Sequence, residues 1–399
     1  MQLFTHPSTL WTKSPTTPST SQGSLVLASL LSRQPFKGVY AIYLILEFLI
    51  ILPWLLARYS LKSTRPFPQW NLKTCITTRA VRQIFVYHTV TRSDGLASVI
   101  SDHQKAKEHY SVATPVDPEL SQVLSPKFAD PAAVGGLWFP GPPPGASPNT
   151  RDEKVVLHLP GSAFVLALGR EMFGREVANV MSRHLGASRT LVAQYRLSSG
   201  TGGVRFPAPI QDIVTVYHQV LSLGIAPQNI LLSGDSAGGT LIIAFLRYLE
   251  ATSKLPPPGG ALLWSPWVHV TSHAGADHEA SRNFEHDILP ASLLQWGVDA
   301  YLPERQPTAD ELPYISPLHH PFRTSVPLHI NAGSAEAFFD TIKEFADEMA
   351  GMNGNQVRFQ PAEFAPHDLV MLYKGYGMER EVELATKDAL EFFGWQGPA

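Results

Sequence analysis

The chain has 399 residues, of which 44% are hydrophobic and 16% charged, so it carries enough apolar material for one large core. Its formal net charge of −3 provides no global basic field, which argues against nucleic acid as a partner. A single cysteine, Cys75, excludes an internal disulfide framework and a zinc cluster built from cysteines.

The N-terminal stretch over residues 1–37 is predicted to be a disordered tail. It is rich in Ser, Thr and Pro, above all before residue 25, and poor in side chains that pack. No acidic residue precedes Glu47, and a Ser-rich, acid-poor start is also typical of an organelle transit peptide. The sequence contains no Asn-x-Ser/Thr sequon, which favours a cytosolic environment.

Residues 38–60 are predicted to form a transmembrane or membrane-anchor helix. The apolar run Val39–Ala57 has 19 residues, which at ~1.5 Å per residue reach about 28 Å, close to the thickness of bilayer hydrocarbon. Glu47 and Pro53 interrupt this run, so a re-entrant or interfacial helix is an alternative. A buried helix of a soluble domain is a further alternative, although such a helix usually shows a polar stripe.

The basic residues around this helix predict its orientation. Two lie upstream and four lie downstream within about 20 residues of the ends. By the positive-inside tendency the C-terminal domain faces the cytosol, and a single-pass protein of the endoplasmic reticulum is expected. The basic residues are Arg33 and Lys37 upstream, and Arg58, Lys62, Arg65 and Lys73 downstream.

Residues 61–399 are predicted to form one catalytic domain. Within it, 72–128 mixes polar and apolar residues with helical spacing in places, which indicates a helical cap region. A cluster of Pro and Gly at 139–145 then predicts an exposed loop before the next strand. No internal repeat is present.

Short apolar runs alternate with helical stretches from residue 154 onward. Strands are expected at 155–157, 190–193 and 229–232, with helices at 170–185 and 208–223 between them. This rhythm predicts a parallel sheet covered by helices on both faces. The functional residues should then lie at the carboxyl ends of the strands.

A Gly-x-Ser-x-Gly motif stands at the end of the strand at 229–232. Gly234–Gly238 contains Ser236 and is followed by an apolar helical segment over 240–246. The small residues allow a sharp turn that exposes the serine hydroxyl above a helix N-terminus, where the helix dipole stabilises negative charge. We expect Ser236 to be a nucleophile, the alternative being a plain glycine turn.

A nucleophilic serine needs a base and an acid that orients the base, and in this strand-turn-helix setting the order along the chain is Ser, acid, His. His367 lies in a turn-like setting near the last helix and is the expected base. Glu336 and Asp340 both follow the expected strand 328–333, and we prefer Glu336 as the acid. Asp340 has an alternative role as an N-terminal charge on the helix expected at 341–350.

These motifs resemble the hormone-sensitive-lipase branch of the α/β hydrolases, which includes carboxylesterases and arylacetamide deacetylases of bacteria and fungi. The resemblance rests on the elbow Gly234–Gly239, on Tyr195–Leu197, on Phe206–Ala208 with Asp212, and on Ser265–Trp267. It implies the α/β-hydrolase fold, a mostly parallel central sheet flanked by helices, here with an N-terminal helical cap and a membrane-anchor helix. The family's acid position again selects Glu336.

The oxyanion loop departs from the family pattern. Where the family has His-Gly-Gly-Gly-Phe, this chain reads Leu159–Phe164, with Pro160 replacing the histidine and Ser162 replacing a glycine. The resemblance implies that backbone N–H groups of Gly161, Ser162 and Ala237 form the oxyanion hole. Losing one such donor costs about 3 to 4 kcal/mol of transition-state stabilisation, so the altered loop is expected to affect the rate of catalysis more than the type of reaction.

The expected function is cleavage of a carboxylic ester through an acyl-enzyme, with no metal ion and no organic cofactor. The anchor and the apolar cap favour a lipophilic small-molecule substrate, and the family's range implies short acyl groups such as acetate, in fungi often in secondary metabolism. Two alternatives remain. One is a ligand-binding protein on the same fold, like the gibberellin receptor, and the other is an amidase or transacylase using the same triad.

Overall fold

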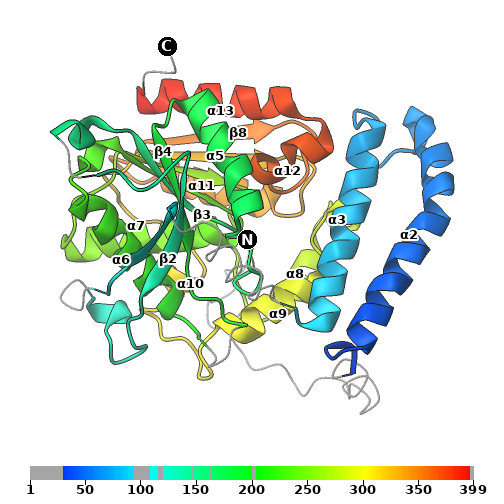
Figure 1. Ribbon diagram of the computed structural model, residues 1–399, viewed down its shortest axis with the longest axis horizontal. Helices are drawn as coiled ribbons and strands as arrows, with labels where there is room; N and C mark the ends of the chain where they lie inside the picture. The colour runs from blue at the N-terminus through cyan, green and yellow to red at the C-terminus, as the bar shows by residue number, and fades with distance from the viewer. Residues whose placement is uncertain are drawn as a thin grey trace, which may run out of the picture.

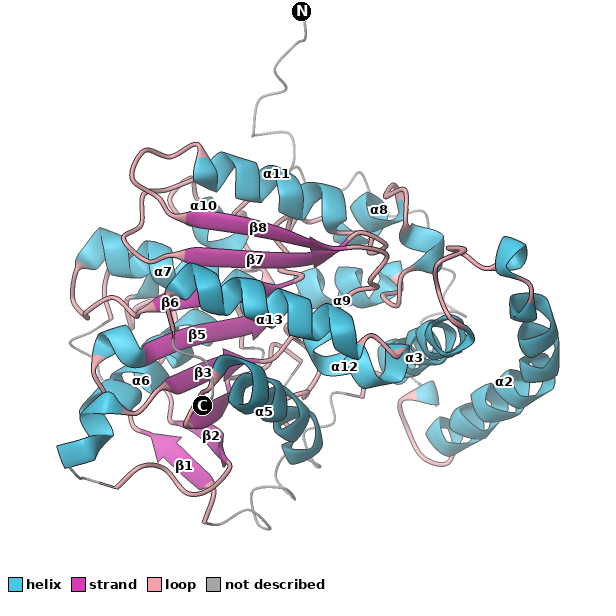
Figure 2. Ribbon diagram, turned by 90° about the horizontal axis from the view of Figure 1, so that it is seen from above, coloured by secondary structure: helices cyan, strands magenta, loops and turns pink. Residues whose placement is uncertain are grey.

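A computed structural model describes residues 30–93, 108–115, 120–145, 148–161, 163–199 and 204–395. Its centre is an eight-stranded sheet with the order β1-β2-β4-β3-β5-β6-β7-β8 (Figures 1 and 2). Neighbours from β4 to β8 pair in parallel, whereas β2 is antiparallel to both β1 and β4. The strands are β1 (Tyr110–Ala113), β2 (Val134–Phe139), β3 (Val155–Leu159), β4 (Arg189–Gln194), β5 (Ile230–Asp235), β6 (Gly260–Trp264), β7 (Leu328–Gly333) and β8 (Val357–Ala362).

The inner strands are buried on both faces. Every residue of β3, β5, β6 and β7 is buried, so the apolar residues of these strands do not mark a single buried face, and polar residues such as His158 in β3 and His329 in β7 are buried among them. The strands expected at 155–157, 190–193 and 328–333 lie in β3, β4 and β7, and the strand expected at 229–232 corresponds to β5, which begins one residue later, at Ile230. The predicted class, a mostly parallel sheet flanked by helices, is confirmed.

Helices cover both faces of the sheet. α5 and α13 pack on one face, and α6, α7 and α11 pack on the other (Figure 2). The helices are α2 (Phe36–Ser60), α3 (Leu72–Thr91), α5 (Glu171–Leu185), α6 (Ala208–Ser222), α7 (Ala237–Thr252), α8 (Ala274–Glu279), α9 (Ala291–Tyr301), α10 (Leu312–Ile315), α11 (Phe339–Ala350), α12 (Leu369–Tyr376) and α13 (Glu379–Phe393).

The segment 72–128, expected as a cap, divides into two parts. Its first part forms α3, which packs against α9 and α12 beside the carboxyl edge of the sheet. Its later part contains β1, which pairs with β2 at the edge of the sheet and therefore belongs to the sheet. Residues 94–107 of the expected cap, and most of the expected tail, lie outside the described residues.

Helix α2 stands apart from the sheet and the helices that cover it. It runs along α3, which separates it from the sheet, and forms one end of the long axis of the molecule (Figure 1). It is long and apolar enough to cross a membrane by length and composition. Most of its side chains are exposed, unlike those of a core helix.

Hydrogen bonds from side chains of α3, and from Trp70 just before it, hold this helix against the rest of the domain. The Trp70 indole and the Thr74 hydroxyl donate to backbone carbonyls of the C-terminal region at 2.6 and 2.7 Å. Near the middle of α3, the Arg82 guanidinium donates to the Asp287 carbonyl at 2.6 Å. Cys75 is buried on the same helix, and burial raises the pKa of its thiol to about 11. The α3 helix is thus part of the folded domain.

A buried ion pair closes the connection between β4 and α6. The Arg196 guanidinium bridges Asp212 at 2.8 Å, and the Arg196 amide donates to the same carboxylate at 2.7 Å. Arg196 also donates to the carbonyl of Asp130, so it links three segments. Burial raises the pKa of Asp212 to about 6, although Arg196 opposes this rise. The pair is therefore needed to keep the carboxylate charged inside the protein.

We expect Arg196→Ala to lower the free energy of unfolding by about 3 kcal/mol, because it leaves the buried Asp212 carboxylate without its partner. The measurement is urea denaturation followed by tryptophan fluorescence. The matched control is Lys343→Ala, which removes an exposed i,i+4 pair with Asp347 and should cost less than about 0.5 kcal/mol. Equal losses from the two substitutions would contradict a special role for the Arg196 pair.

Candidate active site

Ser236 occupies a strained turn between β5 and α7. Its backbone angles, φ 49° and ψ −120°, lie in a region that non-glycine residues rarely adopt. The Ser236 amide donates to the Trp264 carbonyl at 2.9 Å, which ties the turn to the end of β6. The strain holds the serine at the carboxyl edge of the sheet, where its side chain borders a cavity.

Two glycines allow the backbone to approach this turn closely. A Cβ atom on Gly238 would collide with the carbonyl of Leu159 at the end of β3. A Cβ atom on Gly161 would collide with the carboxylate of Asp235 and lie 2.9 Å from the Cβ atom of Ser236. The motif glycine and the loop glycine therefore act together to bring β3, the turn and α7 into contact.

Glu336 and His367 form a buried acid–imidazole pair. The Nδ1–H of His367 donates to Glu336 Oε2 at 2.6 Å, and both side chains are almost fully buried. The other carboxylate oxygen of Glu336 accepts a hydrogen bond from the Gly333 amide at 3.0 Å, at the end of β7. This arrangement fixes the imidazole and directs Nε2 away from the acid.

Asp340 does not reach the imidazole. It lies in the first turn of α11, is 63% exposed, and pairs with Arg282 at 2.8 Å. The structure thus brings together His367 and Glu336, the acid that the motif positions favour. Asp340 has the alternative position considered for it, as an acidic residue at a helix N-terminus.

The charges around His367 change its protonation. Burial alone would lower the pKa of the His367 imidazole, but the hydrogen bond and charge of Glu336 raise it, to about 9 overall. Burial raises the pKa of Glu336, while the contact with His367 opposes this rise. The pair thus favours the imidazolium, the form that appears when a serine gives up its proton.

Neighbouring groups hold the loop that carries His367. The Tyr376 hydroxyl donates to the His367 carbonyl at 2.9 Å. The ring of Phe338 meets the imidazole edge to face, with 5.4 Å between the ring centroids. On the next residue, the Asp368 amide donates to the hydroxyl of Ser265 at 3.3 Å. These contacts come from α12, β7–α11 and β6, so several parts of the fold position the imidazole.

Asp235, directly before Ser236, forms a second buried network. Its Oδ1 lies 3.1 Å from Nε2 of His158, and Nδ1 of His158 lies 3.1 Å from the Ser233 hydroxyl. Its Oδ2 accepts a hydrogen bond from the Gly161 amide at 2.7 Å. His158 is a buried residue of β3, so it contacts Asp235 from a neighbouring strand of the sheet.

This network bears on the expected oxyanion hole. The Gly161 N–H points to Asp235, so in this structure it is engaged. Ala237 is the first residue of α7, and an N–H at that position has no acceptor inside the helix. The Tyr195 hydroxyl donates to the Pro160 carbonyl at 2.8 Å and holds the loop from the opposite side. Ser162 lies outside the described residues.

Asp368 is a site residue that the sequence analysis missed. It is buried, lies at the start of α12 in the left-handed region with φ 60°, and hydrogen-bonds the carboxyl of Asp235. Burial and the Asp235 charge raise the pKa of Asp368 well above its ordinary value. Its Oδ1 has no hydrogen-bond partner within the described residues. In the sequence, the only indication of a role for Asp368 is its position directly after the candidate base.

A small cavity joins the candidate nucleophile and base. Ser236 and His367 border the same space of about 20 Å³, together with Asp235 and Asp368. Helix α3 contributes Phe85 to the wall, and the segment around α9 contributes further apolar side chains. The remaining lining residues are Gly161, Ala163, Leu166, Leu168, Ile288, Leu289, Leu293 and Leu294. A strained turn with a serine that borders a cavity, a paired imidazole and an apolar wall are the elements of acyl transfer at serine.

Comparisons with known proteins agree with this architecture. A family model described as the alpha/beta hydrolase fold matches residues 156–371. An acetyl-hydrolase of Streptomyces hygroscopicus is 30% identical over 213 residues, which are 53% of this chain and 67% of that protein. The putative steryl acetyl hydrolase mug81 of Schizosaccharomyces pombe is 31% identical over 132 residues, 31% of this chain and 33% of that protein.

Solved structures show the same fold. An esterase from the bacterial hormone-sensitive lipase family superposes with a TM-score of 0.55 at 22% identity, over 79% of this chain and 97% of that one. A mutant of the esterase rPPE gives a TM-score of 0.60 at 15% identity, over 84% of this chain and all of that one. The fold is thus the α/β-hydrolase fold. The chain belongs to the α/β-hydrolase family.

We expect Glu336→Gln to lower kcat by about three to four orders of magnitude, because an amide does not stabilise the imidazolium and can hold the wrong tautomer. The assay is hydrolysis of p-nitrophenyl acetate by the purified protein. Asp340→Asn is the matched control, since its exposed carboxylate pairs with Arg282, and it should keep kcat within about twofold. The opposite result would assign the acid to Asp340.

The pKa of about 9 for His367 predicts an alkaline activity profile. A base must be neutral to accept a proton, and below its pKa the neutral fraction falls about tenfold per pH unit. We therefore expect kcat/KM to rise with pH up to about 9 and then level off. Steady-state rates across this range, corrected for spontaneous hydrolysis, measure it. A plateau that already begins near pH 7 would mean that Glu336 does not raise this pKa.

Proposed function

We propose that the protein is a serine esterase that removes a short acyl group, such as acetate, from a lipophilic small molecule. The observation that carries the proposal is the cavity in which Ser236 and His367 meet, with Glu336 bonded to the far side of the imidazole. Relatives named esterase and acetyl-hydrolase support a carboxylic ester hydrolase. Neither a metal ion nor an organic cofactor enters the proposed chemistry.

The proposed reaction has two halves. His367 takes the proton of Ser236, whose oxygen attacks the ester carbonyl and forms a tetrahedral oxyanion. As this intermediate collapses, the alcohol leaves with the proton from His367, and the acyl group stays on Ser236. Water then attacks the acyl-enzyme with His367 as base again, which releases the acid and restores the serine. Glu336 keeps the imidazole oriented and stabilises its positive charge in both halves.

Stabilisation of the oxyanion depends on backbone amides near Ser236. In the proposal Ala237 donates from the start of α7, where the helix dipole adds to the effect. Gly161 donates after it exchanges its present acceptor, Asp235, for the oxyanion. Ser162 completes the proposed hole.

The size and lining of the cavity support a short acyl group. Its volume of about 20 Å³ leaves little room beside Ser236, and its wall is mostly apolar. Leu293 and Leu294 of α9 and Phe85 of α3 close it on the side of the helices. An acetyl methyl group fits such a space, whereas a long chain would need these helices to move.

The alcohol part and the location follow from other observations. The name steryl acetyl hydrolase of the yeast relative, and the exposed apolar helix α2, support a lipophilic alcohol. We further propose a fungal, membrane-anchored enzyme, held through residues 38–60 at the endoplasmic reticulum with the catalytic domain in the cytosol. A role in secondary metabolism rests on the family resemblance and stays a prediction.

We expect a fluorophosphonate probe to label the wild-type protein and to fail with Ser236→Ala, because the probe reacts with an activated serine hydroxyl. His367→Ala should also abolish labelling. In parallel, p-nitrophenyl acetate should be hydrolysed at least about tenfold faster than the octanoate, because the cavity is small. Labelling that persists in Ser236→Ala would place the nucleophile elsewhere.

One observation favours a second function. Because the Gly161 amide already donates to Asp235, the oxyanion hole could be too weak for turnover, and the same cavity would then bind a ligand. Absence of labelling and of hydrolysis in the wild type would select this ligand-binding function. Labelling together with faster turnover of an aryl amide than of its ester would select the amidase alternative.

A further inference from the structure

Helix α2 presents an apolar surface on the side that faces away from α3. Leu44 and Leu55 are buried against α3, whereas the opposite side consists of large apolar side chains that are exposed. Patches of this extent are rare on soluble monomers and mark interaction surfaces. We name this surface the outer face, and it consists of Val39, Ile42, Tyr43, Ile45, Leu46, Leu49, Ile50, Trp54 and Leu56.

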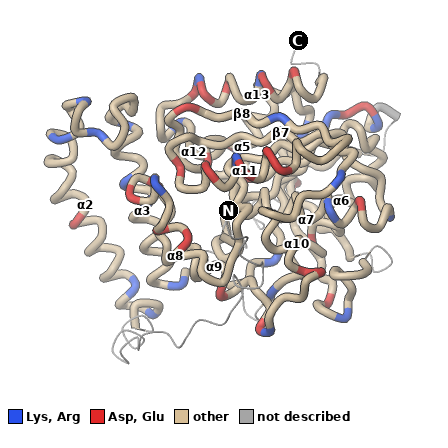
Figure 3. The backbone as a smooth tube through the Cα atoms, turned by 180° about the vertical axis from the view of Figure 1, so that it is seen from behind, with Lys and Arg blue, Asp and Glu red and all other residues tan. Residues whose placement is uncertain are grey.

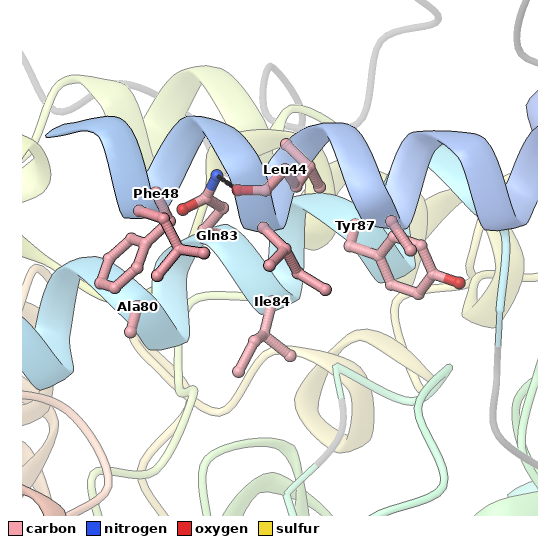
Figure 4. A pocket seen from close by; sticks show the side chains of 9 residues that line it. Leu44, Phe48, Ala80, Gln83, Ile84 and Tyr87 are labelled. Carbon is pink, nitrogen blue, oxygen red and sulfur yellow. Dashed lines mark hydrogen bonds between the residues drawn. The ribbon is translucent and has the colours of Figure 1, made fainter. Parts of the chain in front are cut away.

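The charge within the apolar run is turned toward the protein. Glu47 is the one charged residue between Lys37 and Arg58. The amide of Gln83, on α3, donates to Glu47 Oε2 at 3.2 Å and to the Leu44 carbonyl at 3.0 Å. Figure 4 shows Gln83 reaching up from α3 to Leu44 on α2. The outer face is therefore free of charge, although its helix contains a glutamate.

A groove between α2 and α3 continues this surface. Its volume is about 340 Å³, and its lining is apolar apart from Gln83, whose amide is already bonded to α2 (Figure 4). Ile45 and Leu49 belong both to the groove and to the outer face, so the two are continuous. The groove is lined by Ala41, Leu44, Ile45, Phe48, Leu49, Ala80, Gln83, Ile84 and Tyr87.

Basic side chains lie at both ends of the outer face. Along the sequence, Arg33 and Lys37 lie at the start of α2 and Arg58 and Lys62 at its end, and Figure 3 shows basic positions at both ends of this helix; the Lys37 ammonium donates to the Ser93 hydroxyl at 2.9 Å. The Arg58 guanidinium lies over the Trp54 ring, 5.1 Å from its centroid. Aromatic and basic residues beside an apolar surface match the headgroup region of an anionic bilayer, in which Trp and Arg are both favoured.

The packing of α3 decides how this surface meets a bilayer. Because α3 lies along α2 and is bonded to the catalytic body, an α2 helix that crossed the bilayer would bring α3 with it. Lys73 and Arg79 of α3 are exposed, and each charge at the centre of a bilayer costs about 2.5 to 3.5 kcal/mol or more. An α2 helix in the plane of the bilayer avoids this cost and buries the whole outer face.

We propose that α2 lies in the plane of one leaflet of an anionic bilayer and that an aliphatic chain of a lipid occupies the groove between α2 and α3. This inference refines the proposed membrane attachment. It rests on the proposed function only where it relates the lipid surface to ester cleavage at Ser236. Phe85 of α3 borders the cavity of Ser236, so the helix under the lipid surface is also a wall of the candidate active site. The groove and the cavity share no lining residue, but both are bordered by α3.

Vesicle flotation tests the surface. The full chain is mixed with vesicles of phosphatidylcholine alone or with added phosphatidylserine, and flotation should be stronger with phosphatidylserine. The double variant Ile42→Glu, Leu46→Glu should reduce bound protein at least about tenfold, because it places two charges in the hydrocarbon. The matched control is Met172→Glu, Leu384→Glu, on exposed apolar residues of α5 and α13, which should float like the wild type. Equal flotation of both double variants would overturn the proposal.

Chemical labelling distinguishes an in-plane helix from a spanning one. The chain is translated with sealed microsomes as Gln34→Cys or as Ser60→Cys, and Cys75 is buried and should stay unreactive. A membrane-impermeant maleimide should label both positions without detergent if α2 lies in one leaflet. Protection of one position until detergent is added would show a spanning helix and overturn the in-plane arrangement.

Occupation of the groove has a separate test. A brominated acyl chain in the phosphatidylcholine quenches nearby aromatic fluorescence, and Tyr87 lines the groove. In a Trp54→Phe background, which removes the tryptophan of the outer face, a tryptophan placed there, Tyr87→Trp, should be quenched more than the remaining native tryptophans, and adding Ala80→Phe to fill the groove should reduce this excess. No excess quenching would overturn the lipid site.

An activity assay distinguishes a failure of this proposal from a failure of the proposed function. The outer-face double variant should hydrolyse p-nitrophenyl acetate like the wild type, since Ile42 and Leu46 do not border the cavity. Vesicle binding without any hydrolysis would refute the esterase and leave the lipid surface in place. If the wild type forms dimers through the outer face and does not float, a second copy is the occupant and the lipid proposal fails.

Discussion

The approach of three backbone segments around Ser236 is the constraint on which the rest of the structure depends. The end of β5, the start of α7 and the loop after β3 meet at contact distance, and Gly161 and Gly238 leave the necessary room. This contact fixes the left-handed strain of the nucleophile. It also places Asp235, which precedes the serine, against the loop that is expected to contribute to the oxyanion hole. The geometry of the chemistry therefore follows from a packing requirement between strands and a helix.

Local signals in the sequence predicted the elements that surround this contact. Buried strands appear as short apolar runs, and the expected strand 328–333 coincides with β7. The expected helix 208–223 differs from α6 by one residue at its end. The order of serine, acid and histidine also led to a pair, Glu336 and His367, that the structure brings within 2.6 Å. Each of these signals lies within one element or one motif.

Features that depend on distant partners were not predicted. The edge strand β1 has only four residues, and its place in the sheet comes from β2, which is 21 or more residues further along the chain. Asp368 acquires its unusual environment from Asp235, more than a hundred residues earlier. Glu47 was the charge that counted against the membrane helix predicted at 38–60, because the sequence does not reveal that Gln83 binds this carboxylate. In each of these examples the structure is determined by contacts between residues that are far apart in the sequence, and not by local secondary-structure propensity.

Helix α3 borders both the groove beside α2 and the cavity of Ser236, and this has a practical consequence for the design of soluble forms of the protein. Apolar N-terminal helices are often deleted to obtain a soluble protein, and the two natural boundaries for such a deletion lie after α2 and after α3. Because Phe85 borders the cavity and Arg82 supports the loop before α9, a truncation that removes α3 would open the candidate active site and change what it accepts. A truncation after α2 would instead expose the groove side of α3 to water. The shortest soluble form that represents this enzyme therefore begins before Trp70, with polar replacements on the uncovered face of α3.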